Sequence, residues 1–450
     1  TAKNPLVPQV PDGAVSCSSL LELGSSETAA VVALHGKART LHYPRQCYVC
    51  KQKFKQLHHF YDRLCPPCAK LNYEKRLQTA DLRDHVAIVT GARVKIGYEI
   101  TLKLLRSGAM VIATTRFPKD AAYRFARERD FDAWKDKLQI YGMDFRDLGV
   151  IDKFMDHVAA TFGSIDILIN NATQTIRRPV HYYKHLIKSE VAPIPEELNG
   201  VEQLLRSNSN FISATDGTQK MIQMPNGQTF RDGVTVRADV LPPAGIPSSV
   251  LLSQVAVVSE DLESEDITRF FPEGQVDVNN QQVDLRTSNS WIQKIDEIET
   301  MELVEVFAIN AMAPFILNKR AIPLLEKSVN KHKFIINVSA MEGKFYHKKT
   351  PYHPHTNMAK TAANMMTRTA AADLAKRGIF MNSVDTGWIN DENPRDIAAR
   401  NAEANFQTPL DEIDAAVRVL DPIFELQQPQ NECKTPIFGQ FLKNFRTSEW

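Results

Sequence analysis

The stretch VAIVTGARVKIG, from Val86 to Gly97, decides the fold of this chain of 450 residues. Its first five residues form a short apolar run, and the glycine turn that follows leads into the segment IGYEITLKLLRSG. A buried strand, a glycine turn and a helix open a βαβ unit, in which the turn and the helix N-terminus can approach a pyrophosphate. The stretch therefore predicts an α/β domain built around a nucleotide-binding turn.

The same alternation continues on both sides of a long interruption. Apolar runs predict strands at 109–115, 138–145, 165–172, 333–339 and 379–387, and helical patterns lie at 153–162, 291–310 and 360–377. Continuous apolar strands that alternate with helices are typical of a parallel sheet covered on both faces. We expect an α/β fold, a Rossmann-type doubly wound parallel sheet, with its core at 84–175 and 291–395.

The remaining segments fall outside this core. Residues 176–290 are too long for an ordinary connection and predict an insertion subdomain or an interaction surface. Within them, VLLSQVAVV at 250–258 favours β structure, an acidic cluster lies at 260–266, and NNQQ at 279–282 predicts a loop. Residues 1–34 predict a flexible tail that packs on the chain's own body or is held by a partner, and 396–450 form a C-terminal extension.

Composition restricts the class of protein. The net charge is +1, with 24% charged and 43% hydrophobic residues, which is ordinary for a soluble protein. No run of 18 apolar residues predicts a membrane span, and residues 1–20 lack the pattern of a signal peptide. We expect a cytoplasmic protein without a membrane partner, and the composition leaves the oligomeric state open.

Four further motifs carry a family resemblance. They are NNA at 170–172, INAMAPF around Asn310, NVSA around Ser339 and TNMAK, which ends at Lys360. In order and spacing, these motifs and the glycine turn resemble the short-chain dehydrogenase/reductase family, a Rossmann-type group that uses NAD or NADP. The resemblance covers about 84–175 and 291–395, and fold can be inferred from it more safely than function.

The resemblance implies a cofactor site at the glycine turn. Family members carry TGxxxGxG, and here Lys95 stands at the middle glycine, where it crowds the pyrophosphate or pairs with a phosphate. Arg116 stands where NAD-selective proteins have an acidic residue, which favours the 2′-phosphate of NADP. A purely structural role for Arg116, and a turn that no longer binds nucleotide, stay open. The implied set is Thr90, Gly91, Arg93, Lys95, Ile96, Gly97, Arg116, Asp144, Asn171, Ala172, Lys360 and Gly387.

The resemblance also implies a degenerate catalytic site. An active member uses Asn, Ser, Tyr and Lys; Asn310 and Lys360 match, but Thr356 stands at the tyrosine. A threonine hydroxyl has a pKa far above the value of about 10 for a phenol. Ser339 lies one residue early, with Ala340 at the serine position, and a one-residue offset on a strand reverses the side chain. A relocated acid/base is the alternative, chosen from Tyr346, His347, Tyr352, His353 and His355.

Two C-x-x-C pairs predict a metal site before the core. Cys47 and Cys50 are separated by 14 residues from Cys65 and Cys68, and in a reducing compartment this pattern favours zinc over disulfides. Four thiolates complete a closed tetrahedral site, so the zinc is structural. His58 or His59 is the alternative ligand, and Cys17 and Cys433 are expected to be free thiols.

The zinc module, which we place at 35–80, is strongly basic. Ten basic residues and two acidic ones lie between positions 37 and 76, interleaved with aromatic residues. RNA-binding zinc modules use such a mixture of charge and stacking surface; the other interpretation is a structural zinc knuckle with a solvated basic face and a few core aromatic residues. The candidates are Lys37, Arg39, Arg45, Lys51, Lys53, Lys55 and Arg63. The sequence thus predicts an NADP-binding pseudoenzyme that acts as an RNA- or ribosome-associated regulator; the alternative is an active NADP(H)-dependent oxidoreductase.

Overall fold

A computed structural model describes most of the chain. The described residues are 39–198, 200–216, 222–223, 229–231, 234–236, 248–262, 269–346, 348–403, 407–431 and 434–450. They form two compact units, divided between Gln78 and Thr79. The predicted tail, Lys37, His347 and the two cysteines expected to be free, Cys17 and Cys433, lie outside the described residues.

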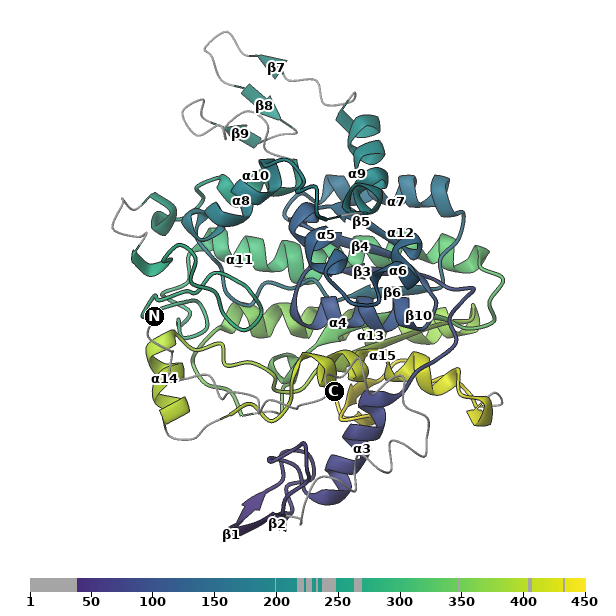
Figure 1. Cartoon of the computed structure of the whole chain (residues 1–450), viewed down its shortest axis with the longest axis vertical. Helices are drawn as coiled ribbons and strands as arrows, with labels where there is room; N and C mark the ends of the chain where they lie inside the picture. The colour runs from purple at the N-terminus through teal and green to yellow at the C-terminus, as the bar shows by residue number, and fades with distance from the viewer. Residues whose placement is uncertain are drawn as a thin grey trace. The chain divides into compact units, whose positions relative to one another are not determined.

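The N-terminal unit is a small hairpin followed by one helix (Figure 1). Strand β1 (Thr40–Gln46) pairs antiparallel with β2 (Lys53–Gln56), and α3 spans Pro66–Leu77. Successive side chains of β2 alternate, so that Phe54 is buried while Lys53 and Lys55 are exposed. Proline in the first turn of α3 suits a position whose backbone N–H has no partner within the helix.

The second unit is built on a single sheet of eight strands. Its order is β5-β4-β3-β6-β10-β11-β12-β13, and neighbours are parallel except for β12 and β13. The strands are β3 (Val86–Thr90), β4 (Met110–Thr115), β5 (Leu138–Gly142), β6 (Ile167–Asn170), β10 (Lys333–Ser339), β11 (Ile379–Asp385), β12 (Phe441–Lys443) and β13 (Arg446–Ser448). This topology confirms the predicted doubly wound fold, and the strand order reverses between β3 and β6, where such sheets bind ligands.

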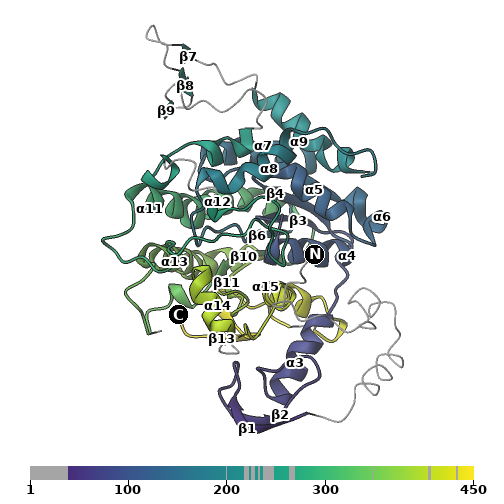
Figure 2. The same cartoon turned by 60° about the vertical axis from the view of Figure 1, so that its left-hand side comes forward.

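Helices cover both faces of the sheet (Figures 1 and 2). Side chains of α4 (Lys95–Arg106), α5 (Pro118–Ala126) and α15 (Glu412–Leu426) pack on one face with Ala87 and Val89 of β3. Side chains of α7 (Gly149–Phe162), α12 (Ala313–Lys327) and α13 (Pro354–Lys376) pack on the other with Ile88. Because both faces are buried, the strands are apolar throughout rather than alternating.

The helix predicted at 291–310 begins later than expected. Helix α11 spans Thr300–Phe307, continues through a π-helical turn at Ala308–Met312 and leads into α12. Ahead of it, the side chains of Asn289 and Glu297 accept hydrogen bonds from the backbone N–H groups of Trp291 and Lys294. Such local bonds offer the backbone an alternative to a helix. The segment Thr300–Lys327 is long and apolar enough to span a membrane, but half of its apolar window is buried in the protein core.

The insertion is mostly helical where it is described. It contains α8 (Lys184–Val191), α9 (Val201–Asp216), α10 (Ser248–Leu251) and a sheet of β7 (Ile222–Gln223), β8 (Thr229–Arg231) and β9 (Val234–Val236). The β structure predicted at 250–258 is wrong, because helical turns span 248–254 and bury Val250 and Ser253, three residues apart. The loop predicted at 279–282 is confirmed as a turn closed by the bridge between Val276 and Gln282. Helix α6 (Phe131–Trp134) in the core and α14 (Arg395–Glu403) in the C-terminal region complete the element order.

A buried charge cluster fixes the insertion to the core. Arg177 forms a bidentate pair with Asp261, with nitrogen–oxygen distances of 3.0 and 2.5 Å, and its Nε lies 3.2 Å from a carboxylate oxygen of Glu305 on α11. All three side chains are almost completely buried. The second Glu305 oxygen pairs with Arg146, which also holds Asp144 at the end of β5.

Replacing Arg177 tests this cluster. We expect Arg177→Met to lower the free energy of unfolding of the second unit by about 3–5 kcal/mol, because it leaves the carboxylates of Asp261 and Glu305 buried with fewer partners. The measurement is urea unfolding followed by circular dichroism. Lys188→Met, which breaks an exposed pair with Glu273 within the same insertion, should leave the midpoint unchanged. Equal shifts for both variants would contradict the assignment.

Candidate cofactor cleft and candidate metal centre

Two glycines of the β3–α4 turn occupy positions that tolerate no side chain. Gly91 has φ +68°, and a Cβ there would lie 2.9 Å from the Cα of Ala172. At Gly97 a Cβ would lie 2.2 Å from the Gly91 carbonyl oxygen. The turn and the first turn of α4 therefore pack backbone against backbone, as a pyrophosphate-binding turn requires.

Thr90 connects this turn to the end of β6. Its hydroxyl oxygen accepts hydrogen bonds from the backbone N–H groups of Asn171 and Ala172, both at 2.9 Å, and donates to the Ile169 carbonyl. The Asn171 amide donates to the Thr90 carbonyl at 3.0 Å. The structure thus brings together the motif residues of the two strands that flank the reversal of strand order.

Lys95 adopts the backbone conformation of a glycine. Its φ is +53°, in the left-handed region that costs a non-glycine residue about 1 kcal/mol or more. Lys95 is the first residue of α4, followed by the half-buried Ile96, and no side chain caps the helix start. The N–H groups of that first turn can serve an anion, and Lys95 takes the left-handed backbone conformation that a glycine adopts readily.

Two arginines lie beside the turn in different electrostatic states. Arg93 pairs with Asp120 at 2.7 Å. Arg116, after β4, donates a hydrogen bond to the Tyr183 hydroxyl at 3.2 Å, and its guanidinium lies 4.9 Å from the Tyr183 ring centroid. Within the part of the chain that the structure describes, Arg116 forms no ion pair. Sequence reasoning gave no signal for Tyr183, which comes from the insertion.

Asp144 is already engaged by a neighbour. Both of its carboxylate oxygens accept hydrogen bonds from the Arg146 guanidinium, the shortest at 2.6 Å. Burial raises the pKa of the Asp144 carboxyl, but the charge of Arg146 outweighs this effect and holds the pKa below its usual value. Asp144 therefore stays ionised, with a resident cation beside it.

Asn310 lies in the π-helical turn between α11 and α12. Its side chain forms two hydrogen bonds with the Gln174 backbone, accepting from N–H at 2.8 Å and donating to the carbonyl at 2.9 Å. The widened turn exposes this asparagine to the chain segment that follows β6. Asn310 thereby ties the end of the first core segment, just before the insertion, to the helix that follows the insertion.

The side chains at the other catalytic positions face protein groups. Lys360 Nζ donates to the Val338 carbonyl at 3.0 Å, and the Ser339 hydroxyl donates to Asn364 on α13 at 2.7 Å. The Thr356 hydroxyl is buried, and no group in the described part of the chain forms a hydrogen bond with it. Burial lowers the pKa of Lys360 to about 8, although the charges of Glu342 and Asp385 oppose the shift.

Gly387 follows β11 at the same edge of the sheet. Its φ is +83°, and its backbone N–H donates to the Asp385 carboxylate at 2.7 Å. That carboxylate also pairs with Lys443 of β12 at 2.7 Å. The loop after β11 is therefore anchored through a glycine in the left-handed region.

A cavity of about 480 Å³ lies over the start of α13. His353 lines it with a fixed orientation: its ring stacks on Trp291, with centroids 3.9 Å apart, and its Nδ1 lies 2.7 Å from the Trp291 carbonyl oxygen. Since a carbonyl only accepts, Nδ1 carries the proton and Nε2 is the acceptor nitrogen. Tyr352 also lines the cavity, whereas Tyr346 is hydrogen bonded to Ser448.

His355 differs from His353 in its surroundings. It is buried, neither ring nitrogen has a hydrogen-bond partner, and Nε2 lies 3.8 Å from Glu302. Burial, assisted by the charge of His353, lowers the pKa of His355 to about 4, so its ring is neutral near pH 7. Of the relocated candidates in the described part of the chain, His353 combines cavity access with a fixed tautomer.

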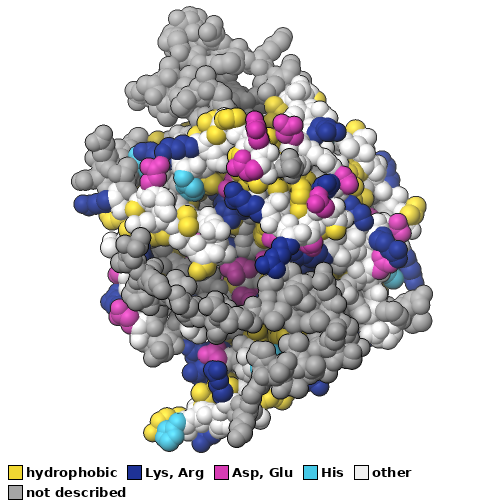
Figure 3. All heavy atoms as spheres, in the orientation of Figure 1, with side chains coloured by type: hydrophobic (Ala, Val, Ile, Leu, Met, Phe, Trp, Pro, Cys, Tyr) yellow, Lys and Arg dark blue, Asp and Glu magenta, His cyan; other side chains and the backbone are white. Residues whose placement is uncertain are grey.

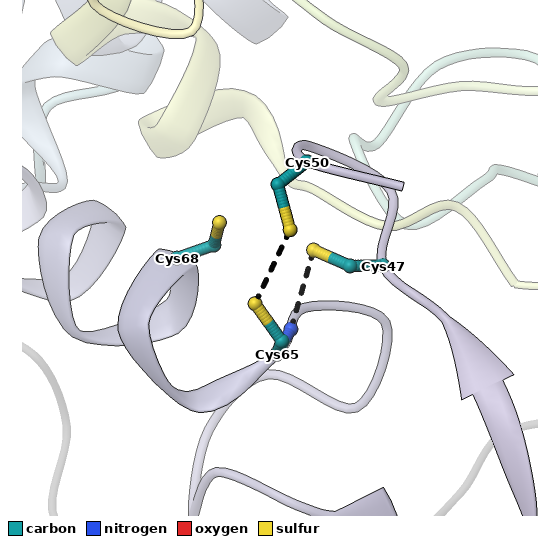
Figure 4. A group of neighbouring side chains, drawn as sticks. All are labelled: Cys47, Cys50, Cys65 and Cys68. Carbon is teal, nitrogen blue, oxygen red and sulfur yellow. Dashed lines mark hydrogen bonds between the residues drawn. The ribbon is translucent and has the colours of Figure 1, made fainter. Parts of the chain in front are cut away.

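The four cysteines of the N-terminal unit converge (Figure 4). Their sulfur atoms all lie within 4.8 Å of one another, with Cys50 and Cys65 3.5 Å apart. Four thiolates at about 2.3 Å from a zinc ion would be about 3.8 Å apart, so the spacing fits a tetrahedral site. The backbone N–H of Cys65 donates to the Cys47 sulfur at 3.3 Å, as expected around a metal-bound thiolate.

The thiols differ in their readiness to ionise. Burial opposes ionisation of Cys47, but backbone N–H groups, foremost that of Cys65, outweigh it and lower the pKa of the thiol to about 7. Burial raises the pKa of the Cys68 thiol. His58, the alternative ligand, instead accepts backbone hydrogen bonds from Phe60 and Tyr61, and the described cluster contains cysteines alone. The cluster is a candidate closed zinc site with no open coordination position.

The predicted nucleic-acid candidates are not equivalent. Arg39, Lys51, Lys53 and Lys55 are exposed, whereas Arg45 pairs with Asp62 at 3.0 Å; Arg63 is partly buried. Among the aromatic residues, Tyr43 and Phe60 are exposed, while Phe54 and Tyr61 belong to the core of the unit. In contrast to this local concentration of lysine and arginine, acidic and basic side chains are intermixed over the face of the second unit shown in Figure 3.

Comparisons with known proteins identify the family of the core. Residues 85–189 match the family model for short chain dehydrogenase, and residues 277–416 match that for enoyl-(acyl carrier protein) reductase. The uncharacterized protein R665 of Acanthamoeba polyphaga mimivirus is 30% identical over 403 residues, which cover 87% of this chain and 73% of that protein. A 2-dehydro-3-deoxy-D-gluconate 5-dehydrogenase of Pseudoalteromonas atlantica is 28% identical over 36% of this chain and 61% of its own length.

Solved structures show similar folds. The NADPH-bound carbonyl reductase from chicken fatty liver has a TM-score of 0.44 at 17% identity, covering 82% of this chain and 100% of that one. A short-chain dehydrogenase from Burkholderia cenocepacia in complex with NADP has a TM-score of 0.46 at 17% identity, covering 80% and 96%. From the sequence matches, this chain belongs to the short-chain dehydrogenase/reductase family, whose NAD(P)-binding oxidoreductase core it shares.

The metal centre gives a direct prediction. The purified chain should contain about one zinc per molecule, and Cys50→Ser should lose it, because a closed site needs all four thiolates. Elemental analysis measures the metal, and limited proteolysis between residues 39 and 78 measures the order that the metal provides. Cys433→Ser serves as the matched control and should retain the zinc. Zinc retained in full after Cys50→Ser would exclude the four-cysteine site.

Proposed function

We propose that this chain is an NADP-binding member of its family that acts by binding and regulation, without the tyrosine-dependent proton transfer of active members. The observation that carries the proposal is the environment of Thr356 and Lys360. The lysine ammonium is buried and donates to the Val338 carbonyl, while the buried hydroxyl of Thr356, at the expected tyrosine position, has no hydrogen-bond partner among the described residues. Because Thr356 occupies the expected tyrosine position, that position offers no phenol whose pKa Lys360 could lower.

The position of Ser339 supports the same proposal. Its hydroxyl donates to Asn364 on α13, and Ala340 occupies the following position, where the resemblance expects the serine. A substrate carbonyl would then lack both of the hydroxyl groups that active members supply. Such a loss lowers chemical turnover and leaves cofactor binding intact, because the two functions rest on different residues.

The residues of the turn fit a dinucleotide. Gly91 and Gly97 leave room for close approach of a pyrophosphate, the start of α4 has no capping side chain, and Arg116 has no carboxylate partner among the described residues. An unpaired guanidinium suits the 2′-phosphate of NADP through charge-assisted hydrogen bonds. When bound, the nicotinamide group would supply hydride chemistry, whereas the residues of this chain would bind and orient it.

His353 favours a second candidate function, an active NADP(H)-dependent oxidoreductase with a relocated acid/base. The Trp291 carbonyl fixes its tautomer, and its ring lines the cavity beside Glu342 and Asn357. A neutral imidazole with one acceptor nitrogen is suited to take or return a proton near neutral pH. Burial lowers the pKa of His353, which keeps the ring neutral.

The partner we propose is RNA, within a ribosome or another ribonucleoprotein, bound through the N-terminal unit. The supporting feature is the solvent side of β2, where Lys53 and Lys55 are both exposed, together with the exposed ring of Tyr43 on β1. Lysine side chains neutralise phosphates and a free tyrosine ring can stack on an unpaired base.

Cofactor binding and turnover can be measured separately. We expect NADPH to bind, detected by calorimetry or nucleotide fluorescence, with no NADPH oxidation across a panel of aldehydes and ketones. Gly97→Ala should abolish binding, because its Cβ would meet the Gly91 carbonyl, whereas Gly149→Ala, with no contact closer than 3.4 Å, should not. Turnover in the parent that disappears in His353→Gln but persists in His332→Gln would favour the oxidoreductase; absence of NADPH binding would overturn both candidates.

The RNA partner is tested by sedimentation. In sucrose gradients of cell extract, the native chain should migrate with ribosomes or another large particle, and RNase or added salt should release it. Lys53→Glu/Lys55→Glu should shift it to the free fraction. Lys327→Glu/Lys331→Glu, an equal charge change at exposed sites of the second unit, should not. Migration as a free protein under every condition would exclude the ribosome proposal.

A further inference from the structure

The insertion contacts the candidate cofactor residues at two separate places. At the first, Tyr183 lies over Arg116 and stacks on Phe117, with ring centroids 5.6 Å apart. At the second, the turn at 279–281 meets Arg93 through the Gln281 side chain at 3.4 Å and Arg124 through two backbone carbonyls at 2.8 and 2.9 Å. The insertion is therefore adjacent to the adenosine side of the cleft as the strand order defines it.

Of the arginines around Tyr183, Arg116 is the one that forms no salt bridge within the described residues, although its charge acts on the Asp144 carboxylate. Arg178 pairs with Asp284 at 2.8 Å, and Arg146 pairs with Asp144 and Glu305. Arg116 instead donates a hydrogen bond to the Tyr183 hydroxyl and lies beside two aromatic faces, while Asp144 is hydrogen bonded to Arg146. A half-buried guanidinium in this state favours an anion that reaches it from the cleft.

The protonated Tyr183 hydroxyl can donate a hydrogen bond to the same anion. Burial raises the pKa of this phenol, but the charges of Arg116, Arg146 and Arg178 outweigh burial and lower it, and an anion beside Arg116 would oppose that lowering. The Tyr183 hydroxyl oxygen accepts the hydrogen bond from Arg116, and the hydroxyl donates to no residue in the described part of the chain. A phenol can accept one hydrogen bond and donate another at the same time. An anion beside Arg116 could thus receive one hydrogen bond from the guanidinium and one from the tyrosine.

The start of the neighbouring helix is already occupied. The Glu190 carboxylate on α8 accepts the backbone N–H groups of Lys119 and Asp120 at 3.2 and 2.9 Å, so it caps the first turn of α5. The first N–H groups of α5 therefore bond to Glu190, and the Arg93 guanidinium pairs with Asp120. Among the described side chains at this place, those of Arg116 and Tyr183 form no salt bridge and can bind an added phosphate.

We propose that Tyr183 of the insertion is a specificity-determining residue of the cofactor site: with Arg116 it binds the 2′-phosphate, and so couples the insertion to the phosphorylated cofactor. The proposal rests on the proposed NADP binding. It makes the site a composite of core and insertion, in which NADPH, but not NADH, joins the two parts. Because coupling is reciprocal, the factor by which NADPH favours the docked insertion is also the factor by which displacing the insertion weakens NADPH binding.

Calorimetry with 2′,5′-ADP and 5′-AMP tests this without any turnover. Tyr183→Phe should weaken 2′,5′-ADP about tenfold or more, as loss of a hydrogen bond to a charged group does, and leave 5′-AMP unchanged. Tyr182→Phe makes the same chemical change at the adjacent buried residue and should alter neither ligand. Hydrogen exchange of residues 180–191 should slow with NADPH and not with NADH or inorganic phosphate.

The outcomes separate the two proposals. If the parent binds neither NADPH nor NADH, the proposed function fails. If the parent binds NADPH and Tyr183→Phe keeps the same preference for 2′,5′-ADP, the role of Tyr183 fails while cofactor binding stands. If inorganic phosphate alone slows hydrogen exchange of residues 180–191 as much as NADPH does, Arg116 and Tyr183 form a site for a free anion, and the coupling to the cofactor is overturned.

Discussion

The buried charge cluster around Arg177 is the constraint on which the rest of the second unit depends. A guanidinium enclosed with the carboxylates of Asp261 and Glu305 is tolerable only while every member keeps its partners, since an uncompensated buried charge costs several kcal/mol. Asp261 lies in the insertion, whereas Glu305 belongs to α11 of the core. The cluster therefore makes the position of the insertion conditional on the core. It extends through Arg146 to Asp144, and so reaches the end of β5 beside the cofactor cleft.

This arrangement explains how the turn keeps its shape while its sequence changes. Lys95 takes a left-handed conformation at a glycine position because Gly91 and Gly97, which lie in closer contact, still fix the backbone around it. Constraint at two positions permits variation at the third, at a modest cost in backbone strain. At the catalytic edge, Thr356 stands where the family resemblance leads us to expect a tyrosine, and backbone geometry cannot supply a phenol; our proposed function rests on that difference.

Local sequence predicted the parts of the molecule that local physics determines. The strand from Val86, the contact between Gly91 and Gly97 and the convergence of four cysteines all follow from residues close together in the chain. Tyr183 and Asp261 could not be found in this way, because their roles depend on partners 67 and 84 residues distant. The helix expected from Trp291 begins at Thr300 because Asn289 and Glu297 bond the backbone first. At 250–258, apolar residues with ambiguous periodicity formed helical turns, since the packing of Val250 and Ser253 selects a spacing of three.

The pairing of β6 with β10 has a kinetic consequence. Asn170 and Asn337 donate and accept a buried hydrogen bond at 2.8 Å between neighbouring strands, yet they are 167 residues apart in the chain. Contacts of such separation carry a large loop-closure entropy and slow the folding of the domains that need them. During synthesis, the first half of the sheet must wait, with the edge of β6 uncovered, until the whole insertion has emerged. An early, ordered insertion would shorten that effective loop, so the same segment that contacts the cofactor residues would also govern how quickly the two halves of the sheet meet.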